Sequence, residues 1–474
     1  MITGISSEGK ARLVEANRSE YGERYDRLAF LGPQQAEQAS ARRRELLDAL
    51  AGKALVGCGG TKLDCSDLSP GCRLCAEGSW SCLFVNGRCN CDCFYCPASQ
   101  DDIGLPTTNT VDFRTPVDYV TYLERFGFRG ASMSGGEPLL TPNRTLAFIE
   151  AIKKRFGADM HVWLYTNGTL ATPDLMKRLR DAGLDEIRFD IGATGYRLDK
   201  LRLAVGHIST VTVEIPAIAE EKELLQAKMV EMAEAGVNYL NLHQLRLTPY
   251  NFQRLAPRGY TYLHGDKVTV LDSELTALEL ILHGRERGIP LPVNYCSFVY
   301  KNRYQNRASR RRNAPYLAKD YEQLTENGYI RTLTLIGSTK AIARQRAQLE
   351  TLNAAREHWS LSNNGERLSI HPILWPLIDF TGLHLLISYA TARQLPAVSY
   401  RNPFVAVKLG DRKQVIIERT KVAADFELQD EEIGRFAHTF LSSPPLSAPS
   451  FELENPFEDL ARFEWTPRGL QEYF

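Results

Sequence analysis

The 474-residue sequence lacks an excess of charge of either sign, because 57 Lys and Arg residues balance 57 Asp and Glu residues. Composition therefore gives no argument for binding to nucleic acid or to an anionic membrane surface. No apolar run suits a membrane span, since the most apolar stretch, 373–392, contains Pro376, Asp379, Gly382 and His384. The N-terminus also lacks the apolar core of a signal peptide. We expect a soluble cytoplasmic protein with neither nucleic acid nor membrane as a partner.

Cysteine is scarce outside one short region. Nine of the ten cysteines lie between Cys58 and Cys96, and Cys296 stands alone. In a long chain of ordinary composition, such clustering favours metal ligation over a disulfide framework and indicates a reducing compartment. The chain is long enough for two or three domains with a sizeable core, and it contains no P-loop.

Three of these cysteines, Cys89, Cys93 and Cys96, have Cys-x3-Cys-x2-Cys spacing. Three thiolates on a tight loop can hold three irons of a [4Fe–4S] cluster and leave the fourth iron free of protein. An open metal position is where a small molecule binds and reacts. The alternatives are a zinc knuckle and a buried thiol cluster, although zinc sites usually show paired Cys-x2-Cys units. Cys91 does not fit the spacing, and we interpret it as a bystander.

A Gly/Ser/Asp-rich loop is expected upstream, over residues 58–82. It holds a symmetric set of four cysteines with spacers of six, two and six residues: Cys65, Cys72, Cys75 and Cys82. The central Cys-x2-Cys is a usual metal-chelating turn, and the flanking thiols can complete an all-sulfur site. Such a site suits a single iron, zinc or part of a second cluster, and ligand softness does not separate them. Cys58 is an alternative to Cys65 as the fourth ligand.

Downstream of the triad, strands alternate with helices, which predicts a parallel sheet with right-handed crossovers. Six strands are expected: 82–85, 130–134, 161–166, 186–191, 211–216 and 239–245. The second strand ends in Gly135-Gly136-Glu137-Pro138, where glycines let the backbone approach a ligand and a carboxylate can accept from an ammonium group. The third ends in Thr166-Asn167-Gly168, which alone would be a common strand-ending turn.

These motifs, in this order, resemble the radical SAM (S-adenosylmethionine) superfamily over roughly residues 80–297. The resemblance implies a partial (β/α)6 TIM-like barrel with a [4Fe–4S] cluster and SAM at the C-terminal mouth of the strands. The SAM amino and carboxylate groups would chelate the open iron. One electron, from a donor such as ferredoxin or flavodoxin, would cleave SAM to methionine and a 5′-deoxyadenosyl radical, which abstracts hydrogen from a substrate.

The resemblance also implies contacts to SAM from the two strand-end motifs: Gly135, Gly136, Glu137 and Asn167. Arg188 and Asp190 share one face of their strand, where Arg188 could pair with the SAM carboxylate and Asp190 could accept from ribose hydroxyls. The alternative for this pair is a structural ion pair inside the barrel. Glu214 is a further candidate contact on the next strand. His243 resembles the adenosine-contacting position of several members, although a lone histidine is more often structural.

The cysteine-rich loop narrows the resemblance. It looks like the loop of the cobalamin-dependent radical SAM arginine C-methyltransferase of methyl-coenzyme M reductase, the methanogenesis marker 10 type. In that group the loop implies one iron held by four cysteines, which here are Cys65, Cys72, Cys75 and Cys82. A C-terminal domain there helps to bind cobalamin. This sequence has no Asp-x-His-x-x-Gly cobalamin motif.

The expected organisation has five parts: an N-terminal helical segment (1–57), the Cys-rich metal loop (58–82), the barrel (83–300), a basic connector (301–330) and a C-terminal α+β domain (331–474). The resemblance implies that this last domain helps to bind cobalamin. The basic connector is either a solvated face or a grip for an anionic cofactor or an acidic partner. Cys296, just before it, is a metal ligand, a neighbour of the substrate or a small buried hydrophobe.

The sequence therefore predicts a radical SAM enzyme that C-methylates an unactivated carbon of a protein or peptide residue, arginine in the resembling group, through methylcobalamin. One alternative is a cobalamin-independent enzyme with an auxiliary iron site that modifies peptides or activates a partner. The other is a non-catalytic metal-binding scaffold, against which the paired strand-end motifs argue. No local signal identifies the modified residue.

Overall fold

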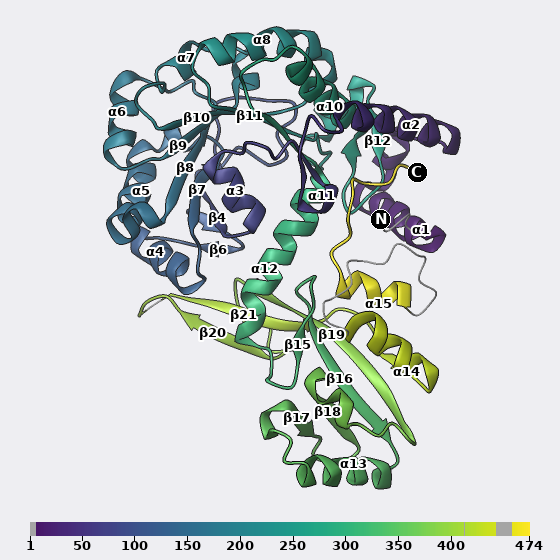
Figure 1. The fold of residues 1–474 in the computed structure, drawn as a ribbon. Helices are drawn as coiled ribbons and strands as arrows, with labels where there is room; N and C mark the ends of the chain where they lie inside the picture. Colours follow the sequence, from purple (N-terminus) through teal and green to yellow (C-terminus); the bar gives the residue numbers. More distant parts are fainter. Residues whose placement is uncertain (1–5, 412, 442–456) are drawn as a thin grey trace. The chain divides into compact units, whose positions relative to one another are not determined.

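The computed structural model describes residues 6–411, 413–441 and 457–474. These residues divide into two compact units, which Figure 1 shows as a ribbon. The larger unit comprises the described residues of 4–108, 112–305 and 468–474, and the smaller those of 109–111 and 306–467. The chain thus leaves the larger unit after Gln305, and its final residues return to it.

The larger unit is organised around an open sheet whose central strands are parallel. In spatial order these are β4 (Trp80–Asn86), β7 (Gly130–Gly135), β8 (His161–Thr166), β9 (Glu186–Phe189), β10 (Thr210–Pro216), β11 (Tyr239–His243) and β14 (Val293–Cys296). Short strands extend both edges: β2 (Val56–Gly57) and β3 (Lys62–Leu63) beyond β14, and β5 (Thr107–Thr108) and β6 (Val111–Asp112) beyond β4. The predicted partial barrel is confirmed, and β14 is a parallel strand that the sequence analysis did not expect.

Helices cover the outer side of these strands (Figure 1). They are α4 (Pro116–Arg125), α5 (Pro142–Phe156), α6 (Pro173–Asp181), α7 (Asp199–Arg202), α8 (Lys222–Glu234) and α10 (Leu271–Glu286). Three begin with Thr-Pro, in which proline occupies the first helical position. Thr115 and Thr172 also accept a hydrogen bond from the first turn, from the N–H of Asp118 and of Leu175. Local sequence therefore fixes where these crossover helices start.

A short helix, α3 (Pro70–Glu77), lies inside the ring of strands (Figure 1). Its start is fixed by Ser69, which accepts from the N–H of Cys72 at 3.2 Å, and its end by Gly78 in the left-handed conformation. The N–H of Gly71 donates to Glu186 on β9 at 3.0 Å. The expectation of a loop throughout 58–82 is wrong for this part, because Ser-Pro and Gly are the start and stop signals of a helix.

The N-terminal segment forms α1 (Ser7–Tyr21) and α2 (Pro33–Leu50), and the predicted break at Gly32-Pro33 is confirmed. A small sheet of β1 (Ala29–Phe30), β12 (Thr261–Leu263) and β13 (Thr269–Val270) joins this segment to the barrel. Its aromatic core includes Tyr21, Tyr25, Phe252, Tyr260 and Tyr262, with α9 (Phe252–Leu255) contributing one of them. The chain end packs here too, because the hydroxyl of Tyr473 donates to Glu274 at 2.5 Å. The short helix α11 (Phe298–Tyr300) follows β14.

The smaller unit is α+β, as expected, but its bounds differ from the expected 331–474, because it takes in 306–330 and leaves 468–474 to the larger unit. Its antiparallel sheet has the order β17 (Trp359–Leu361), β18 (Arg367–Ile370), β16 (Ile330–Gly337), β19 (Leu383–Leu395), β21 (Gln414–Lys421) and β20 (Phe404–Lys408), with β15 (Gln323–Leu324) on β16 and β22 (Phe426–Leu428) on β19. Its helices are α12 (Asn306–Asn313), α13 (Thr339–Thr351), α14 (Glu431–Phe436) and α15 (Phe457–Glu464). No helix among the described residues is long and apolar enough to cross a membrane.

Candidate active site

The inward faces of the parallel strands line a hollow inside the barrel. Helices cover the outer face, yet alternate positions near the strand ends are partly exposed: Ser134, Tyr165, Glu214, His243 and Cys296. Their strand neighbours, such as Leu242 and Tyr295, are fully buried. Because side chains alternate between the two faces of a strand, the exposed set faces the inside. Parallel strands present their carboxyl ends at one mouth, where barrel enzymes carry out their chemistry.

The loop after β4 carries the cysteine triad and is folded back on itself. The N–H of Cys89 donates to the carbonyl of Gln100, and the N–H of Cys96 donates to the carbonyl of Cys93, both at 3.1 Å. All three thiols are partly exposed. The amide of Gln100 donates to Cys96 Sγ at 2.8 Å, and the amide of Asn167 lies 3.7 Å from Cys89 Sγ. Burial raises the pKa of Cys93 to about 12, and the charge of Asp190 acts in the same direction.

The two glycines of the Gly-Gly-Glu-Pro motif bring the end of β7 against the chain that enters this loop. The N–H of Gly136 donates to the carbonyl of Asn86 at 2.9 Å, and that of Glu137 to the carbonyl of Arg88 at 2.8 Å. A Cβ on Gly135 would lie 2.1 Å from the Asn86 oxygen, and one on Gly136 would lie 2.0 Å from the Arg88 oxygen. Only glycine permits this approach, and Gly135 also has a positive φ of 119°.

Glu137 ties the two strand-end motifs together. Its carboxylate is fully buried and accepts from the N–H of Leu139 at 2.9 Å, the hydroxyl of Thr166 at 2.9 Å and the N–H of Asn167 at 2.7 Å. Burial raises its pKa to about 7 against the opposing effect of these donors. Sequence analysis expected this carboxylate to accept from the SAM ammonium. Because the carboxylate is enclosed and already accepts three bonds, the structure makes it a positioning residue instead.

Asn167 and Asp190 both flank the cysteine loop. The Asn167 amide donates to the side chain of Asn90 at 2.8 Å, within that loop. Asp190 is partly exposed, and its two oxygens lie 2.9 and 3.0 Å from the donating hydroxyl of Tyr95, also in the loop. Burial raises the pKa of Asp190 to about 6, while the Tyr95 hydrogen bond lowers it. Asn167 and Asp190 thus lie beside the triad, and their contacts with SAM stay predictions.

Arg188 has a different place. Its guanidinium is buried and donates to Glu186 at 2.8 Å, to Glu214 at 2.7 Å and to Ser69 at 3.1 Å. The structure therefore assigns it to the ion pair that the sequence left open as the alternative, in place of a contact with the SAM carboxylate. The physical reason is α3, whose preceding residue Ser69 covers this level of the barrel. Glu214 keeps a partly exposed side chain toward the hollow.

His243 faces the hollow at the end of β11, paired in register with Cys296. Its Nδ1 is buried and has no hydrogen-bond partner among the described residues. Burial lowers the pKa of His243 to about 3, and the charge of Lys301 adds to this effect. The imidazole is therefore neutral at pH 7, and its buried Nδ1 is an unsatisfied polar atom.

The upstream cysteines do not gather as a set of four. Cys72 and Cys75 lie on α3, whereas the Cys65 thiol points into its own loop and contacts the Lys62 carbonyl at 3.6 Å. Burial raises the pKa of Cys82 to about 11, opposed by hydrogen bonds with Ser132 and Ser134. In the part of the chain that the structure describes, no three His, Cys, Asp or Glu side chains are arranged to hold a single ion. The four-cysteine mononuclear iron site stays a prediction.

Sequence reasoning missed the surroundings of Cys296. The Lys62 ammonium, on β3, donates to Cys296 Sγ and to the Asn294 side chain, both at 2.6 Å. The alternation of Asn294 and Cys296 repeats that of Asn241 and His243 on the neighbouring strand, and this signal could have identified β14. Nothing local marks Lys62, because its position depends on the antiparallel pairing of β3 with β14.

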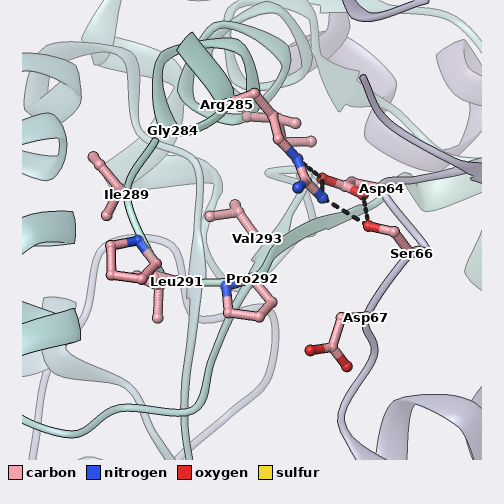
Figure 2. A pocket seen from close by; sticks show the side chains of 11 residues that line it. Asp64, Ser66, Asp67, Gly284, Arg285, Ile289, Leu291, Pro292 and Val293 are labelled. Carbon is pink, nitrogen blue, oxygen red and sulfur yellow. Dashed lines mark hydrogen bonds and ion pairs between the residues drawn. The ribbon is translucent and has the colours of Figure 1, made fainter. Parts of the chain in front are cut away.

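A separate cavity of about 370 Å³ lies between α10, the start of β14 and residues 64–67. Figure 2 shows Arg285 reaching across it to Asp64 and Ser66. Arg285 Nε donates to Asp64 at 2.7 Å, so these two charged groups of its wall satisfy each other. The cavity borders Val293, at the amino end of β14, whereas Cys296 lies at the carboxyl end. It is not part of the site at the mouth.

Comparisons with known proteins bear on this site. The model of the radical SAM superfamily matches residues 83–207. A Methanocaldococcus jannaschii protein named "Putative glycyl-radical enzyme activating enzyme" is 32% identical over 276 residues, which cover 56% of this chain and 72% of the relative. The GTP 3′,8-cyclase of Corynebacterium glutamicum strain R is 31% identical over 110 residues, 23% of this chain and 29% of the cyclase.

Two solved structures are also similar. One is anSMEcpe with bound AdoMet, with 14% identity and a TM-score of 0.34, covering 45% of this chain and 62% of that chain. The other is TsrM from Kitasatospora setae with cobalamin and a [4Fe–4S] cluster bound, with 15% identity and a TM-score of 0.28. It covers 36% of this chain and 35% of that chain. This chain thus spans less than two thirds of the cyclase and of both solved chains.

Proposed function

The chain belongs to the radical SAM superfamily, and from this premise we propose that it cleaves SAM and removes a hydrogen atom from a protein or peptide substrate. The observation that carries the proposal is one hydrogen-bonded unit. The carboxylate of Glu137 joins the Gly-Gly-Glu-Pro turn to the Thr-Asn-Gly turn, and the backbone of the same turns joins the cysteine loop. Motifs that are far apart in the sequence thus meet at the barrel mouth.

The donor set fits a [4Fe–4S] cluster. Cys89, Cys93 and Cys96 are the three thiolates that would hold it, and three is the number that leaves one iron open. Hydrogen bonds to the cluster ligands are the usual outer support of such a site. Here Gln100 donates to Cys96 Sγ, and Asn167 lies beside Cys89 Sγ. When bound, the cluster and SAM supply the carbon radical that abstracts hydrogen.

The residues around the mouth fit SAM as well. Neutral His243, partly exposed at the end of β11, suits the adenosine contact that the resemblance implies. The carboxylate of Asp190, partly exposed beside the triad, suits the ribose hydroxyls. Gly135, Gly136 and Glu137 act indirectly, because their contacts position the loop. The barrel wall around these groups would limit the access of water to the reacting atoms.

Two fates of the substrate radical extend the proposal. The finer version is methylation of a protein carbon, arginine in the resembling group, through methylcobalamin bound with the help of the smaller unit. The similarity of the cysteine-rich loop supports it. The second candidate is abstraction of hydrogen from a partner enzyme without cobalamin. The Methanocaldococcus jannaschii relative, whose name describes an activating enzyme, favours this candidate.

The test is anaerobic purification followed by iron, sulfide and zinc analysis, a visible spectrum and chromatography of SAM products after reduction. We expect iron, sulfide and 5′-deoxyadenosine. Cys93→Ala should abolish 5′-deoxyadenosine formation, whereas the matched change Cys91→Ala in the same loop should leave it intact. Zinc without iron, or equal loss in both variants, would overturn the proposal. A corrinoid band and a mass gain of one methyl group on a candidate partner peptide would select methylation, and their absence with retained SAM cleavage would select the second candidate.

A further inference from the structure

We propose that Cys72, Cys75 and Cys296 hold a second iron–sulfur cluster inside the barrel. The inference goes beyond the proposed function and does not depend on SAM cleavage. It differs from the expected four-cysteine site in using Cys296, which lies far away in the sequence. It also leaves out Cys65 and Cys82.

The three thiols meet around one group of buried polar side chains. Asn241 on β11 donates to Cys72 Sγ at 3.2 Å, and the side chains of Asn241 and Asn294 hydrogen-bond to each other. The Lys62 ammonium contacts Asn294 and Cys296 Sγ, both at 2.6 Å. Helix α3, β11, β14 and β3 therefore bring their polar groups to one place.

Cys75 joins the same group through Tyr300. The Tyr300 hydroxyl donates to Cys75 Sγ at 3.2 Å, and the Gln305 amide lies 3.5 Å from the same sulfur. The ring of Tyr300 lies under the Lys62 ammonium, with 5.3 Å between Nζ and the ring centroid. The segment after β14 thus contributes donors to the thiol of α3.

Each of the three sulfurs faces at least one hydrogen-bond donor, as Cys82 also does through Ser132 and Ser134. Cys82 is left out because it lies on β4 and, among the described residues, has no contact with the group around Lys62, Asn241 and Asn294. The donors are an amide for Cys72, a phenol and an amide for Cys75, and an ammonium for Cys296. Donors aimed at sulfur are what thiolate ligands of iron–sulfur clusters require, and they tune such clusters. The triad shows the same pattern at Cys96, with Gln100 as donor. Cys65 shows the opposite, because its own thiol points at a carbonyl oxygen.

The charge of Lys62 supports the same conclusion. Its side chain is 1% exposed, and within the described ranges of the chain it has no carboxylate partner. A buried ammonium is costly unless an anion compensates it. A cluster held by three thiolates carries net negative charge and meets this need inside the barrel.

A cluster places different demands on its ligands than a single ion does. No three candidate ligands among the described residues can reach one ion. The ligands of a [4Fe–4S] cluster bind different irons, so they stay apart while facing a common centre. Cys75 and Cys296 are both partly exposed residues.

The experiment separates this centre from the first by removing the first. In a Cys89→Ala/Cys93→Ala/Cys96→Ala variant, anaerobic reconstitution with iron and sulfide should leave about four irons and four sulfides per chain. Adding Cys296→Ala or Cys72→Ala should reduce the bound iron at least fivefold. Adding Cys65→Ala or Cys82→Ala, the matched controls, should leave it unchanged. Cys296→Ser covers the case in which the alanine variant does not fold, and should change the electron paramagnetic resonance spectrum of the reduced cluster.

Three results would overturn the proposal: a triple variant that binds no iron or only zinc, iron that survives Cys296→Ala, or iron lost equally with Cys82→Ala. Thermal unfolding of each variant without iron shows whether the fold is intact. The outcome is independent of the proposed function. If the unmodified protein cleaves no SAM while the triple variant retains iron, the proposed function fails and the second cluster stands.

Discussion

Replacing Glu137 with glutamine tests the electrostatics of the unit that joins the two strand-end motifs. The amide is isosteric, but it does not titrate and offers only one acceptor oxygen where the carboxylate accepts three bonds. One buried donor, the N–H of Asn167 or of Leu139, would then face an NH2 group. An unsatisfied buried donor costs about 1–3 kcal/mol. The difference in unfolding free energy between the unmodified protein and Glu137→Gln is most informative when it is measured as a function of pH.

The sign of that dependence follows from the pKa of Glu137, which burial raises from 4.5 to about 7 in the folded protein. A carboxyl with a raised pKa contributes its full stability below its unfolded pKa, and the contribution is lost as the pH rises through the folded value. The unmodified protein should therefore lose about 3 kcal/mol relative to Glu137→Gln between about pH 4.5 and pH 7, at 1.36 kcal/mol per pKa unit. The variant's disadvantage should shrink over this window.

The assay is urea unfolding of the apo protein at several pH values across this window, followed by tryptophan fluorescence. Trp80 and Trp163, stacked 5.9 Å apart inside the barrel, report on the larger unit. Thr166→Val is the matched control, since it keeps the carboxyl and removes one donor that lowers its pKa. In that variant the upper end of the window should move to higher pH, while its lower end, set by the unfolded chain, stays in place. A disadvantage of Glu137→Gln that grows with pH would refute the reasoning, because it would mean that the donors outweigh burial.

Three further predictions concern the same region. Gly136→Ala should destabilise the protein by about 1–3 kcal/mol in urea unfolding and weaken cluster retention, whereas Gly434→Ala, with open space around it, should be neutral or stabilising. Arg188→Ala should cost about 3–5 kcal/mol by leaving buried carboxylates unpaired, and Arg188→Lys should keep SAM affinity in equilibrium dialysis if no SAM contact is lost. Tyr95→Phe removes a hydrogen bond that lowers the pKa of Asp190, so the acid limb of SAM cleavage should move to higher pH; an unmoved limb would contradict a role for that carboxylate.

Spacing and local signals were enough to predict much of the barrel and its mouth. The alternation of strands with helices is a local signal, so it identified the crossovers. The positions of Asn167 and Asp190 beside the triad followed from their places at strand ends, which parallel strands bring together. These features depend on chain order and strand direction alone.

Chain order and strand direction did not predict the level of the barrel at which an inward side chain finds its partners. The prediction that Arg188 faces the inside of the barrel was correct, but its partners there are Glu186 and Glu214 and not SAM. That level was set by α3, whose Ser69 start and Gly78 stop were overlooked because the cysteines suggested a loop. Lys62 was missed for a related reason, since a two-residue strand carries almost no periodic signal.

The Gly-Gly-Glu-Pro motif makes its contacts with other parts of the protein chain. Its glycines are required by the carbonyls of Asn86 and Arg88, and its glutamate by the N–H of Asn167. Each requirement comes from another part of the chain, and each concerns the segment that carries or flanks the cysteine triad. The motif therefore holds the loop in shape before any ligand arrives. Preorganisation of this kind lets donors such as Gln100 point at sulfur without further rearrangement. Replacing either glycine should therefore weaken cluster binding directly and weaken SAM binding only as a consequence.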